Sequence, residues 1–278
     1  IFTKDRKNNY NPLTIKKDED SHKIVEECML LANKIAAKEI IDLNKDSNRS
    51  GLFRNHDIPD QKNEDYIKNI IAKFSKAKTD SQKLTIKSIN EFFNYFHGTD
   101  LYNIISMLFI RKMQKAFYST YSIGHYGLGF NEYTHFTSPI RRYSDLLVHR
   151  IIKKRFKNFN TLPDSIIFCN SGELKAKQAS RDYTKIKSLR WLKNQENKIL
   201  HGIITNIKPS LITLCETSSE TTGYIETRTL PRDLYNLSSN RLILLGKFSK
   251  NRYEVGQKID IKIDQIDMLN QHVTFTLQ

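Results

Sequence analysis

The chain has few of the residues that mark secreted, zinc-binding or membrane proteins. It has 3 cysteines in 278 residues, Cys28, Cys169 and Cys215, and none forms a Cys-x-x-Cys spacing. This pattern argues against a disulfide framework and a cysteine zinc site, and it is typical of a reducing compartment. No run of about eighteen apolar residues is present, so no membrane-spanning helix is predicted. The sequence therefore indicates a cytoplasmic protein with no membrane partner.

Acidic residues are also scarce, because 30 Asp and Glu face 45 Lys and Arg, which gives a formal charge of +15. The excess is uneven. Residues 198–278 hold 10 basic and 8 acidic residues, which leaves 35 against 22, a net of +13, for the first 197 residues. Because surplus basic charge attracts polyanions, we expect the anion-binding surface in those first 197 residues.

Two basic runs hold much of this charge. Such runs are as often solubilising surfaces as ligand sites, but here they flank an arginine motif, which favours a groove that follows a nucleic-acid backbone. The first run comprises Arg141, Arg142, Arg150, Lys153, Lys154, Arg155 and Lys157, and the second comprises Lys175, Lys177, Arg181, Lys185, Lys187, Arg190 and Lys193.

The arginine motif lies within residues 133–150, which read YTHFTSPIRRYSDLLVHR. Ser138 is a favourable N-cap and Pro139 suits the first helical position, so a helix is predicted to begin there. Its first turn would then carry Arg141 and Arg142. Unpaired N–H groups, the helix dipole and a planar guanidinium together suit a phosphodiester. The expected ligand is nucleic acid.

A purely structural reading of the same helix stays open at this point. Ile140, Tyr143, Leu147 and Ile151 recur at helical spacing and would form a core face. Arg141 and Asp145 are four residues apart and could simply pair on the surface.

The remaining pattern predicts an α+β chain. A helix from Asp20 or Ser21 to about Ile40 would bury an apolar row, with Glu26 and Asn33 on its polar side. That row is Ile24, Cys28, Leu31 and Ile35, with Val25, Met29, Ala32 and Ala36 beside it. Further helices are expected at 66–74, 84–96, 101–118 and 173–195. Five strands, at 198–206, 211–215, 221–226, 258–266 and 273–277, suit an OB-type barrel.

Three segments resemble the RNB family of 3′-to-5′ exoribonucleases, and in particular its ribonuclease R branch. They are Ser21–Asn33 (SHKIVEECMLLAN), Leu52–Pro59 (LFRNHDIP) and Gly124–Phe130 (GHYGLGF) running into 133–150. A segment with Glu173, Ala179, Arg181 and Asp182 resembles a further family pattern. The resemblance implies that residues 1–196 form the helix-rich C-terminal part of an RNB catalytic domain. It implies an S1-type OB-fold RNA-binding domain over residues 197–278.

The resemblance also implies the site. Arg141 would be the catalytic group that stabilises charge at the phosphoryl centre, while Thr137, Ser138 and Arg142 would position the RNA backbone. Glu26 and Glu27 would lie by the RNA path, where a carboxylate accepts a hydrogen bond from a ribose 2′-hydroxyl. Arg150, Arg181 and Lys185 are also expected to contact RNA. His125 and His135 are interpreted as structural.

The implied reaction is hydrolysis of single-stranded RNA to nucleoside 5′-monophosphates by two Mg²⁺ ions. The family's D-x-x-x-x-x-D-D cluster of metal-binding aspartates is absent, however, and Asp18-Glu-Asp20 reads as the solvated flank of a helix. We therefore expect no metal site in this chain, which begins with Ile1 and reads as the C-terminal portion of a longer protein. Alone, it should be a monomer that binds single-stranded RNA weakly without cleaving it.

Two other functions stay open. The chain could be a non-catalytic RNA-binding remnant or scaffold. A duplex-DNA-binding protein is a third possibility, based on charge alone, since no groove-reading motif is present.

The barrel adds one departure from the family. Its first hairpin reads IKPSLITL over 207–214, without the Gly-aromatic-x-aromatic stretch whose rings stack on bases. We therefore expect this module to guide RNA rather than to anchor it.

Overall fold

The computed structural model describes residues 2–5, 10–12, 19–45, 51–74, 86–99, 101–239 and 241–278. Its helices are α1 (Glu19–Lys45), α2 (Gln61–Phe74), α3 (Ile86–Phe96), α4 (Leu101–Ile110), α5 (Tyr143–Ile152) and α6 (Leu162–Lys193). Its strands are β1 (Phe2–Lys4), β2 (Tyr10–Pro12), β3 (Phe53–Asn55), β4 (Phe117–Ser119), β5 (Leu200–Lys208), β6 (Leu211–Glu216), β7 (Thr222–Glu226), β8 (Tyr235–Leu237), β9 (Ile243–Gly246), β10 (Arg252–Glu254), β11 (Lys258–Asp267) and β12 (His272–Leu277). The predicted α+β class is confirmed.

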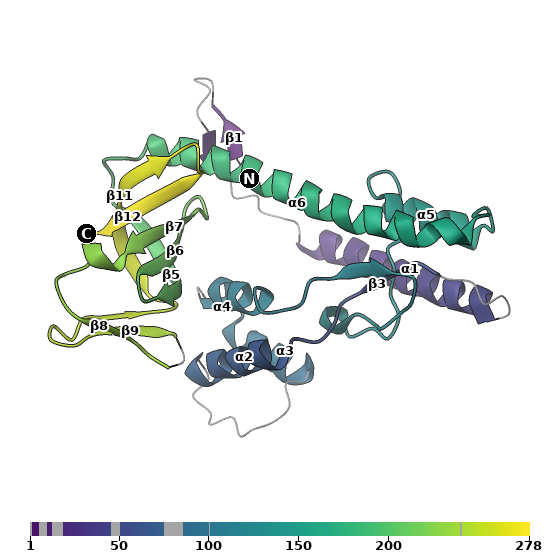
Figure 1. Cartoon of the computed structure of the whole chain (residues 1–278), viewed down its shortest axis with the longest axis horizontal. Helices are drawn as coiled ribbons and strands as arrows, with labels where there is room; N and C mark the ends of the chain where they lie inside the picture. The colour runs from purple at the N-terminus through teal and green to yellow at the C-terminus, as the bar shows by residue number, and fades with distance from the viewer. Residues whose placement is uncertain are drawn as a thin grey trace.

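Helix α6 connects the two ends of the molecule (Figure 1). One end packs against α5, and the other end meets the barrel. At 32 residues it is about 48 Å long. Pro163 lies in its first turn, where the missing N–H costs nothing, and Arg190 and Lys193 lie in its last turn, where they complement the helix dipole. The helix predicted at 173–195 is part of α6, which begins much earlier, at Leu162.

Two hydrophobic cores hold the fold. The larger joins α2–α4, the end of α6 and the barrel, through residues such as Phe92, Phe109, Leu189 and Phe275. The smaller lies between α1, β3, α5 and the start of α6, and includes Ile40, Leu147 and Leu162. The arginine motif borders this smaller core.

The barrel is closed in the order β11-β12-β7-β6-β5, which confirms the five-stranded barrel predicted from five short β-rich runs. Strands β12 and β7 pair in parallel, and the other neighbours are antiparallel. Gly223 is required at one point, because a Cβ there would come within 2.1 Å of the Phe275 ring. The prediction missed a separate three-stranded sheet, β10-β9-β8, which extends from the barrel.

Several helix predictions need correction. The apolar row of α1 is not buried, since Ile24, Leu31 and Ile35 are 66%, 59% and 58% exposed, and Cys28 is also exposed. Helix α1 instead buries Asn33, Ala36, Ala37 and Ile40, so the prediction for Asn33 was wrong. The predicted helix at 101–118 stops at Ile110, because the chain turns and enters β4 at Phe117.

The acidic run at 18–20 is only partly described, because Asp18 lies outside the described residues. Residues 75–85, between α2 and α3, also lie outside them. Among the described residues, no helix combines the length and the apolar character that crossing a bilayer requires.

Candidate nucleic-acid interface

The arginine motif forms a turn before α5, not the first turn of the helix. The carbonyl of Ser138 accepts hydrogen bonds from the N–H groups of Arg141 and Arg142, at 3.3 and 3.0 Å. Arg142 then adopts an extended backbone (φ −125°, ψ 117°), and α5 begins at Tyr143. The prediction that Ser138 caps the helix, with both arginines in its first turn, was therefore wrong. Arg142 is the N-cap residue, and its side chain forms no capping hydrogen bond.

Asp145 explains why the helix begins there. Its carboxylate is fully buried, and one oxygen accepts hydrogen bonds from the Ser138 N–H at 2.7 Å and from Arg142 Nη2 at 2.8 Å. The other oxygen accepts from the Ser144 hydroxyl at 3.1 Å. A buried carboxylate in the first helical turn also benefits from the helix dipole. The surface pair of Arg141 with Asp145, which was left open as an alternative, is thus replaced by a partly buried pair with Arg142.

Arg141 stays exposed beside this anchored neighbour. Ile140 is also fully exposed, at 102%, so the predicted core face includes Leu147 and Ile151 but not Ile140. Tyr143 is 44% exposed. The arginine pair is therefore divided, because one guanidinium is held in place and the other is directed to solvent, where it can meet a phosphate.

Two polar atoms of the motif are shielded from water and have no partner in the described part of the chain. They are Thr137 Oγ1 and Arg142 Nε. Because unpaired buried polar groups are costly, such atoms indicate a place where a missing partner would bind.

Behind the motif, a hydrogen-bonded network fixes β4 to α5. The Tyr118 hydroxyl bonds His135 Nδ1 at 2.7 Å and accepts from the Ser144 hydroxyl at 3.0 Å. Tyr118 is buried, and burial raises its pKa above the ordinary value. Its ring also contacts the Arg54 guanidinium carbon, which lies 4.5 Å from the ring centroid.

A buried ion pair then joins β3 to α6. Arg54 donates two parallel hydrogen bonds to Glu173, at 2.7 and 2.9 Å, and Lys177 forms an ion pair with the same carboxylate at 2.6 Å. Burial alone would raise the pKa of Glu173, but hydrogen bonds from these two cations outweigh it and hold the pKa below its usual value. These two parallel hydrogen bonds fix the position of β3 relative to α6.

Asn33 fastens α1 to the same region. Its carbonyl oxygen accepts from the Phe136 N–H at 2.8 Å, and its amide donates to the Tyr133 hydroxyl at 2.9 Å. Residues 133–136, the first part of the motif, are thereby held by α1 on one side. His149 Nε2 bonds the Phe136 carbonyl at 3.0 Å from the other side, and the two rings stack 4.1 Å apart.

The glycine-rich loop at 124–130 packs on His56. The Gly127 N–H donates to His56 Nδ1 at 2.9 Å, which makes Nε2 the protonated nitrogen that donates to the Gln114 carbonyl at 2.8 Å. A side chain at 127 would collide with this imidazole, since a Cβ would lie 2.7 Å from Nδ1. Gly124 and Gly129 adopt positive φ of 89° and 68°.

His135 and His125 are poor proton carriers near neutral pH. Burial lowers the pKa of His135 to about 3, and the nearby Arg142 and Arg54 cations act in the same direction. Burial, followed by His56, lowers the pKa of His125 to about 4. Both imidazoles are therefore neutral at pH 7, which agrees with a structural role.

This gives a pH prediction. The unfolded pKa of histidine is near 6.5, so between pH 6.5 and about 3 the unfolded chain binds more protons than the folded one. The contribution of His135 to the free energy of unfolding should be fully present above pH 6.5 and should fall as the pH is lowered through this window. His135→Gln should flatten the decline, as measured by urea midpoints from pH 7 to 4. His97→Gln, at an exposed loop residue, is the control, and an unchanged slope for His135→Gln would contradict the assignment.

The other predicted site residues are spread along two helices. Glu26 and Glu27 are exposed on α1, about 10 Å along the helix from Asn33. On α6, Arg181 is exposed and lies about 12 Å along the helix from Glu173, while Lys185 is half-buried. The structure therefore does not bring these four into direct contact with Arg141.

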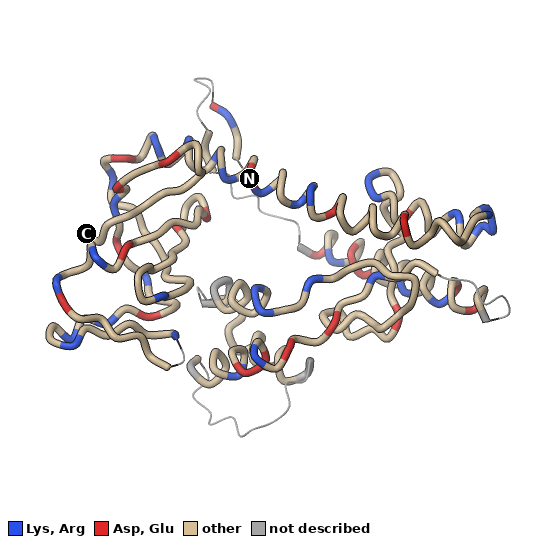
Figure 2. The backbone as a smooth tube through the Cα atoms, viewed as in Figure 1, with Lys and Arg blue, Asp and Glu red and all other residues tan. Residues whose placement is uncertain are grey.

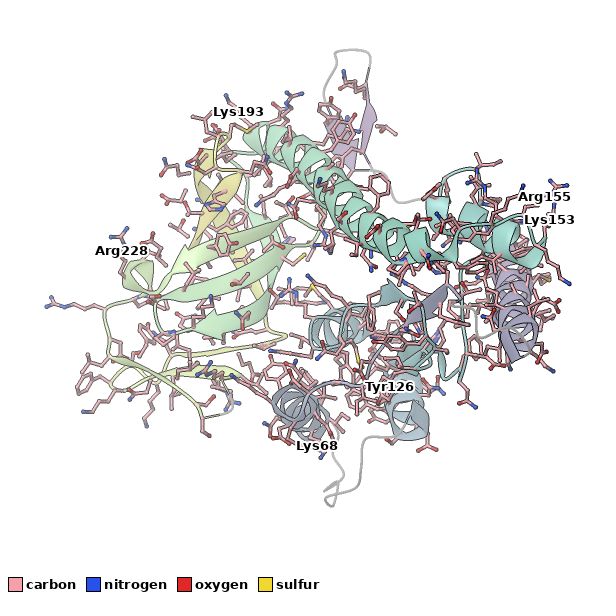
Figure 3. The ribbon with its side chains drawn as sticks, turned by 45° about the vertical axis from the view of Figure 1, so that its right-hand side comes forward. Lys68, Tyr126, Lys153, Arg155, Lys193 and Arg228 are labelled. Atoms are coloured by element: carbon pink, nitrogen blue, oxygen red, sulfur yellow. The ribbon has the colours of Figure 1, made fainter. Side chains whose placement is uncertain are left out.

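The first basic run is divided between the two ends of α5. Arg141 and Arg142 lie at its start, whereas Arg150 lies near its end, about 12 Å away along the helix axis, and residues 153–157 follow that end. Figure 3 shows Lys153 and Arg155 at this tip of the molecule and Lys193 at the far end of α6. Figure 2 shows basic residues along α6 between these ends. The basic residues thus follow the length of the molecule rather than forming one cluster.

The described residues do not fit a divalent metal. Among them, no group of three or more His, Cys, Asp or Glu could hold an ion. Two carboxylates of the site, Asp145 and Glu173, are already bound by arginines. No metal-dependent step is assigned to these residues.

Sequence reasoning missed the residues that support the motif. Arg54, Asn33 and Glu173 lie in segments that carry the family resemblance, but no supporting contact with the motif was predicted for them. Tyr118 had no signal, because it was predicted to end a helix. A mixed group of buried polar residues drawn from several elements cannot be deduced from local periodicity.

Comparisons with known proteins point to one family. The family model described as "RNB domain" matches residues 1–158. A curated relative, ribonuclease R from Buchnera aphidicola subsp. Schizaphis graminum, is 30% identical over 269 residues, which are 93% of this chain and 36% of that protein. The chain thus spans about a third of the length of such relatives.

Solved structures share the fold. Mycoplasma genitalium RNase R in complex with ribose methylated single-stranded RNA matches all of this chain and 45% of its own, with a TM-score of 0.86 and 23% identity. Yeast Ssd1, described as a pseudonuclease, matches 80% of this chain and 28% of its own, with a TM-score of 0.64 and 20% identity.

Proposed function

Because the chain belongs to the RNB domain family, we propose that it is an RNA-binding part of a 3′-to-5′ exoribonuclease of the ribonuclease R type. The whole enzyme would hydrolyse single-stranded RNA to nucleoside 5′-monophosphates. The observation that carries this proposal is the divided arginine pair, in which buried Asp145 anchors Arg142 and leaves Arg141 exposed.

Arg141 has the geometry for charge stabilisation at a phosphoryl group. Its backbone is fixed by the turn at Ser138 and its neighbour by the Asp145 pair, so its planar side chain is presented from a rigid support. Arg142 and Thr137 each have an unpaired atom in the same turn, which suits positioning of the RNA backbone or of the rest of the catalytic domain. Ser138 contributes the turn itself.

The more distant residues suit the path of the strand. Glu26 and Glu27 would accept hydrogen bonds from ribose hydroxyls beside α1. Arg181 and Lys185 would contact phosphates along α6, and Arg150 would do so near the end of α5. Their spread over the length of the molecule agrees with a polymer ligand rather than a mononucleotide.

The metal-binding carboxylates would come from a polypeptide that completes the RNB domain. In the intact enzyme they would hold the Mg²⁺ that activates water. The exposed apolar row of α1 offers a surface for that polypeptide, because Ile24, Leu31 and Ile35 lie on one side of the helix and more than half of each is in solvent.

We also propose that the chain has two domains. Residues 1–196 would form part of the catalytic domain, and residues 197–278 an S1-type RNA-binding domain. The protein would act as a cytoplasmic monomer. The continuous core between α6 and the barrel would keep the two parts together during RNA movement.

The first test compares the chain alone with a completed enzyme. We expect the 278-residue chain to bind a single-stranded oligonucleotide weakly and to release no mononucleotides in Mg²⁺. With about six phosphate contacts, the slope of log affinity against log salt should be near −4. Fluorescence anisotropy measures the binding, and chromatography of the products measures hydrolysis.

The completed enzyme is a chimera in which the N-terminal remainder of Buchnera ribonuclease R precedes this chain. It should release nucleoside 5′-monophosphates from the 3′ end in Mg²⁺. Mononucleotide release by the chain alone would contradict the assignment of the metal site. Absence of RNA binding by both proteins would contradict the proposed function.

A non-catalytic RNA-binding protein remains the second candidate. One observation favours it, since a pseudonuclease shares this fold and the fold alone does not separate the two functions. The chimera distinguishes them. A folded chimera that binds RNA but never hydrolyses it would favour the non-catalytic function.

A further inference from the structure

The charge of residues 198–278 is unevenly distributed. Residues 228–252 hold six basic residues and one acidic residue, a net of +5, whereas the rest of this region holds four basic and seven acidic residues, a net of −3. The six are Arg228, Arg232, Arg241, Lys247, Lys250 and Arg252. This segment contains β8, β9, the first residue of β10 and their connections. The small net charge of the whole region therefore hides one strongly basic surface.

Much of this charge is available for a ligand. Arg228 and Arg252 form ion pairs with Glu226 and Glu254, which flank the segment. The other four basic side chains are exposed, and none forms an ion pair within the described part of the chain. Figure 3 shows Arg228 on this side of the barrel, directed outward.

The sheet has an inner and an outer face. Leu237, Leu244 and Tyr253 are in register across the three strands, and the last two are buried, so this face packs on the barrel. The next row in register, Asn236, Leu245 and Arg252, is exposed. The outer face is therefore open and mixed in character, with apolar and basic groups side by side.

The turn between β9 and β10 displays an aromatic ring. Phe248 is 71% exposed, and the Lys247 ammonium lies 5.5 Å from its ring centroid. An exposed phenylalanine beside lysine is poorly explained by folding alone, since it buries little area. A ring flanked by cations is the combination that binds single-stranded nucleic acid.

The turn is rigid because Asp233 holds it. Its carboxylate accepts hydrogen bonds from the Phe248 N–H at 3.0 Å and the Ser249 N–H at 2.8 Å, and from the Ser249 hydroxyl. The Ser249 hydroxyl and the backbone N–H groups lower the pKa of Asp233 to about 2, so it is ionised at all ordinary pH. Gly246 permits this approach, because a Cβ there would lie 2.3 Å from Asp233 Oδ2.

We propose that the turn bearing Phe248, with Lys247 and Lys250, is a binding site for single-stranded RNA on the outer side of the β8-β9-β10 sheet. The Phe248 ring stacks on a base, and the two lysines contact the adjoining phosphates. This inference rests on the proposed function, which makes RNA the ligand, and it adds the place where this region meets the strand.

The alternative place in the same region is the β5–β6 hairpin. Its turn carries Lys208, Pro209 and Ser210, and no aromatic side chain is available there for stacking. The prediction that the barrel binds RNA only weakly considered this hairpin. The β8-β9-β10 sheet, which was missed, supplies the exposed ring and the charge that the hairpin lacks.

The test places a local reporter at the site. Trp191 is the only tryptophan of the chain and is 8% exposed, so Phe248→Trp adds a single solvent-exposed fluorophore. Titration of the full chain with oligouridylate should quench this added fluorescence. Tyr95→Trp, at a side chain 69% exposed on α3, is the matched control and should not respond.

Affinity gives the second measurement. Phe248→Ala should weaken the binding of oligouridylate to the full chain about 5- to 100-fold. The thermal midpoint should not change, because the ring is exposed. Lys247→Gln with Lys250→Gln should reduce the salt slope by about 1.4, for two lost phosphate contacts. Lys198→Gln with Lys208→Gln removes the same charge elsewhere in the region and should leave the slope nearly unchanged.

The outcomes separate the two proposals. If the wild-type chain binds RNA but Phe248→Trp is not quenched and Phe248→Ala binds normally, the site is refuted and the proposed function stands. If the Lys198 and Lys208 pair lowers the slope instead, RNA follows the hairpin and the site is again refuted. If the wild-type chain binds no RNA, the site is refuted, and if the chimera also binds none, the proposed function fails as well.

Discussion

Arg141→Lys should lower the rate of RNA hydrolysis by the completed chimera at least about 100-fold, with a much smaller effect on RNA binding. Loss of one preorganised donor at a developing charge costs about this much. Lysine keeps the positive charge but cannot present two parallel N–H groups to a phosphoryl oxygen pair. The exposed position of Arg141, next to an anchored turn, makes this donor free to act. Single-turnover hydrolysis measures the effect.

Two matched changes test the interpretation. Arg150→Lys, at an exposed arginine near the end of α5, should change the rate only slightly. Arg142→Lys should lower stability as well as activity, because Arg142 holds the buried Asp145. Full turnover in Arg141→Lys would exclude Arg141 as the charge-stabilising residue.

Asp145→Ala should destabilise the chain by about 3 kcal/mol, which is the largest stability effect that we expect from one polar substitution. The change removes the acceptor of the Ser138 N–H, the Arg142 guanidinium and the Ser144 hydroxyl together. It leaves a cation and an amide unpaired in a partly buried position. Urea denaturation of the 278-residue chain provides the measurement.

Asp164→Ala is the matched control. Asp164 is also the third residue of a helix, α6, but it is exposed. Its replacement removes the same interaction with a helix dipole and should cost less than about 1 kcal/mol. Equal losses for the two variants would mean that the dipole, and not the buried network, determines the effect.

The barrel strands were predictable from the sequence, because short β-rich runs are separated there by turn residues. The predicted bounds 198–206 and 258–266 lie within two residues of the observed strands at 200–208 and 258–267. The small β8-β9-β10 sheet was not predictable in this way. Its strands have only three or four residues each, which is too short for a period to appear.

The start of α5 was predicted wrongly for a different reason. Ser138 and Pro139 satisfy the local preferences for a helix start, and those preferences were the only information available. Asp145 overrides them, because its buried carboxylate takes the Ser138 N–H and draws Arg142 into an extended conformation. That competition depends on the burial of Asp145, which the tertiary fold decides.

The start of helix α1 was predicted to within two residues, but the face that it buries was predicted wrongly. Its most apolar row was expected to be buried, yet the chain buries Asn33 and two alanines instead. Asn33 is inside because Phe136 and Tyr133 need its amide, and those partners lie about a hundred residues away. The division at residue 196 remains a prediction, since the family model ends at residue 158.

The uninterrupted helix α6 also restricts how the protein can change in length. Each added residue would advance the barrel by only about 1.5 Å but would rotate it by about 100° around the helix axis. Between the Glu173 contact with Arg54 and the Leu189 contact with the barrel core, a single insertion would therefore swing the Phe248 turn to another side of the molecule. Only insertions close to a whole number of helical turns would preserve the angular alignment of the two ends.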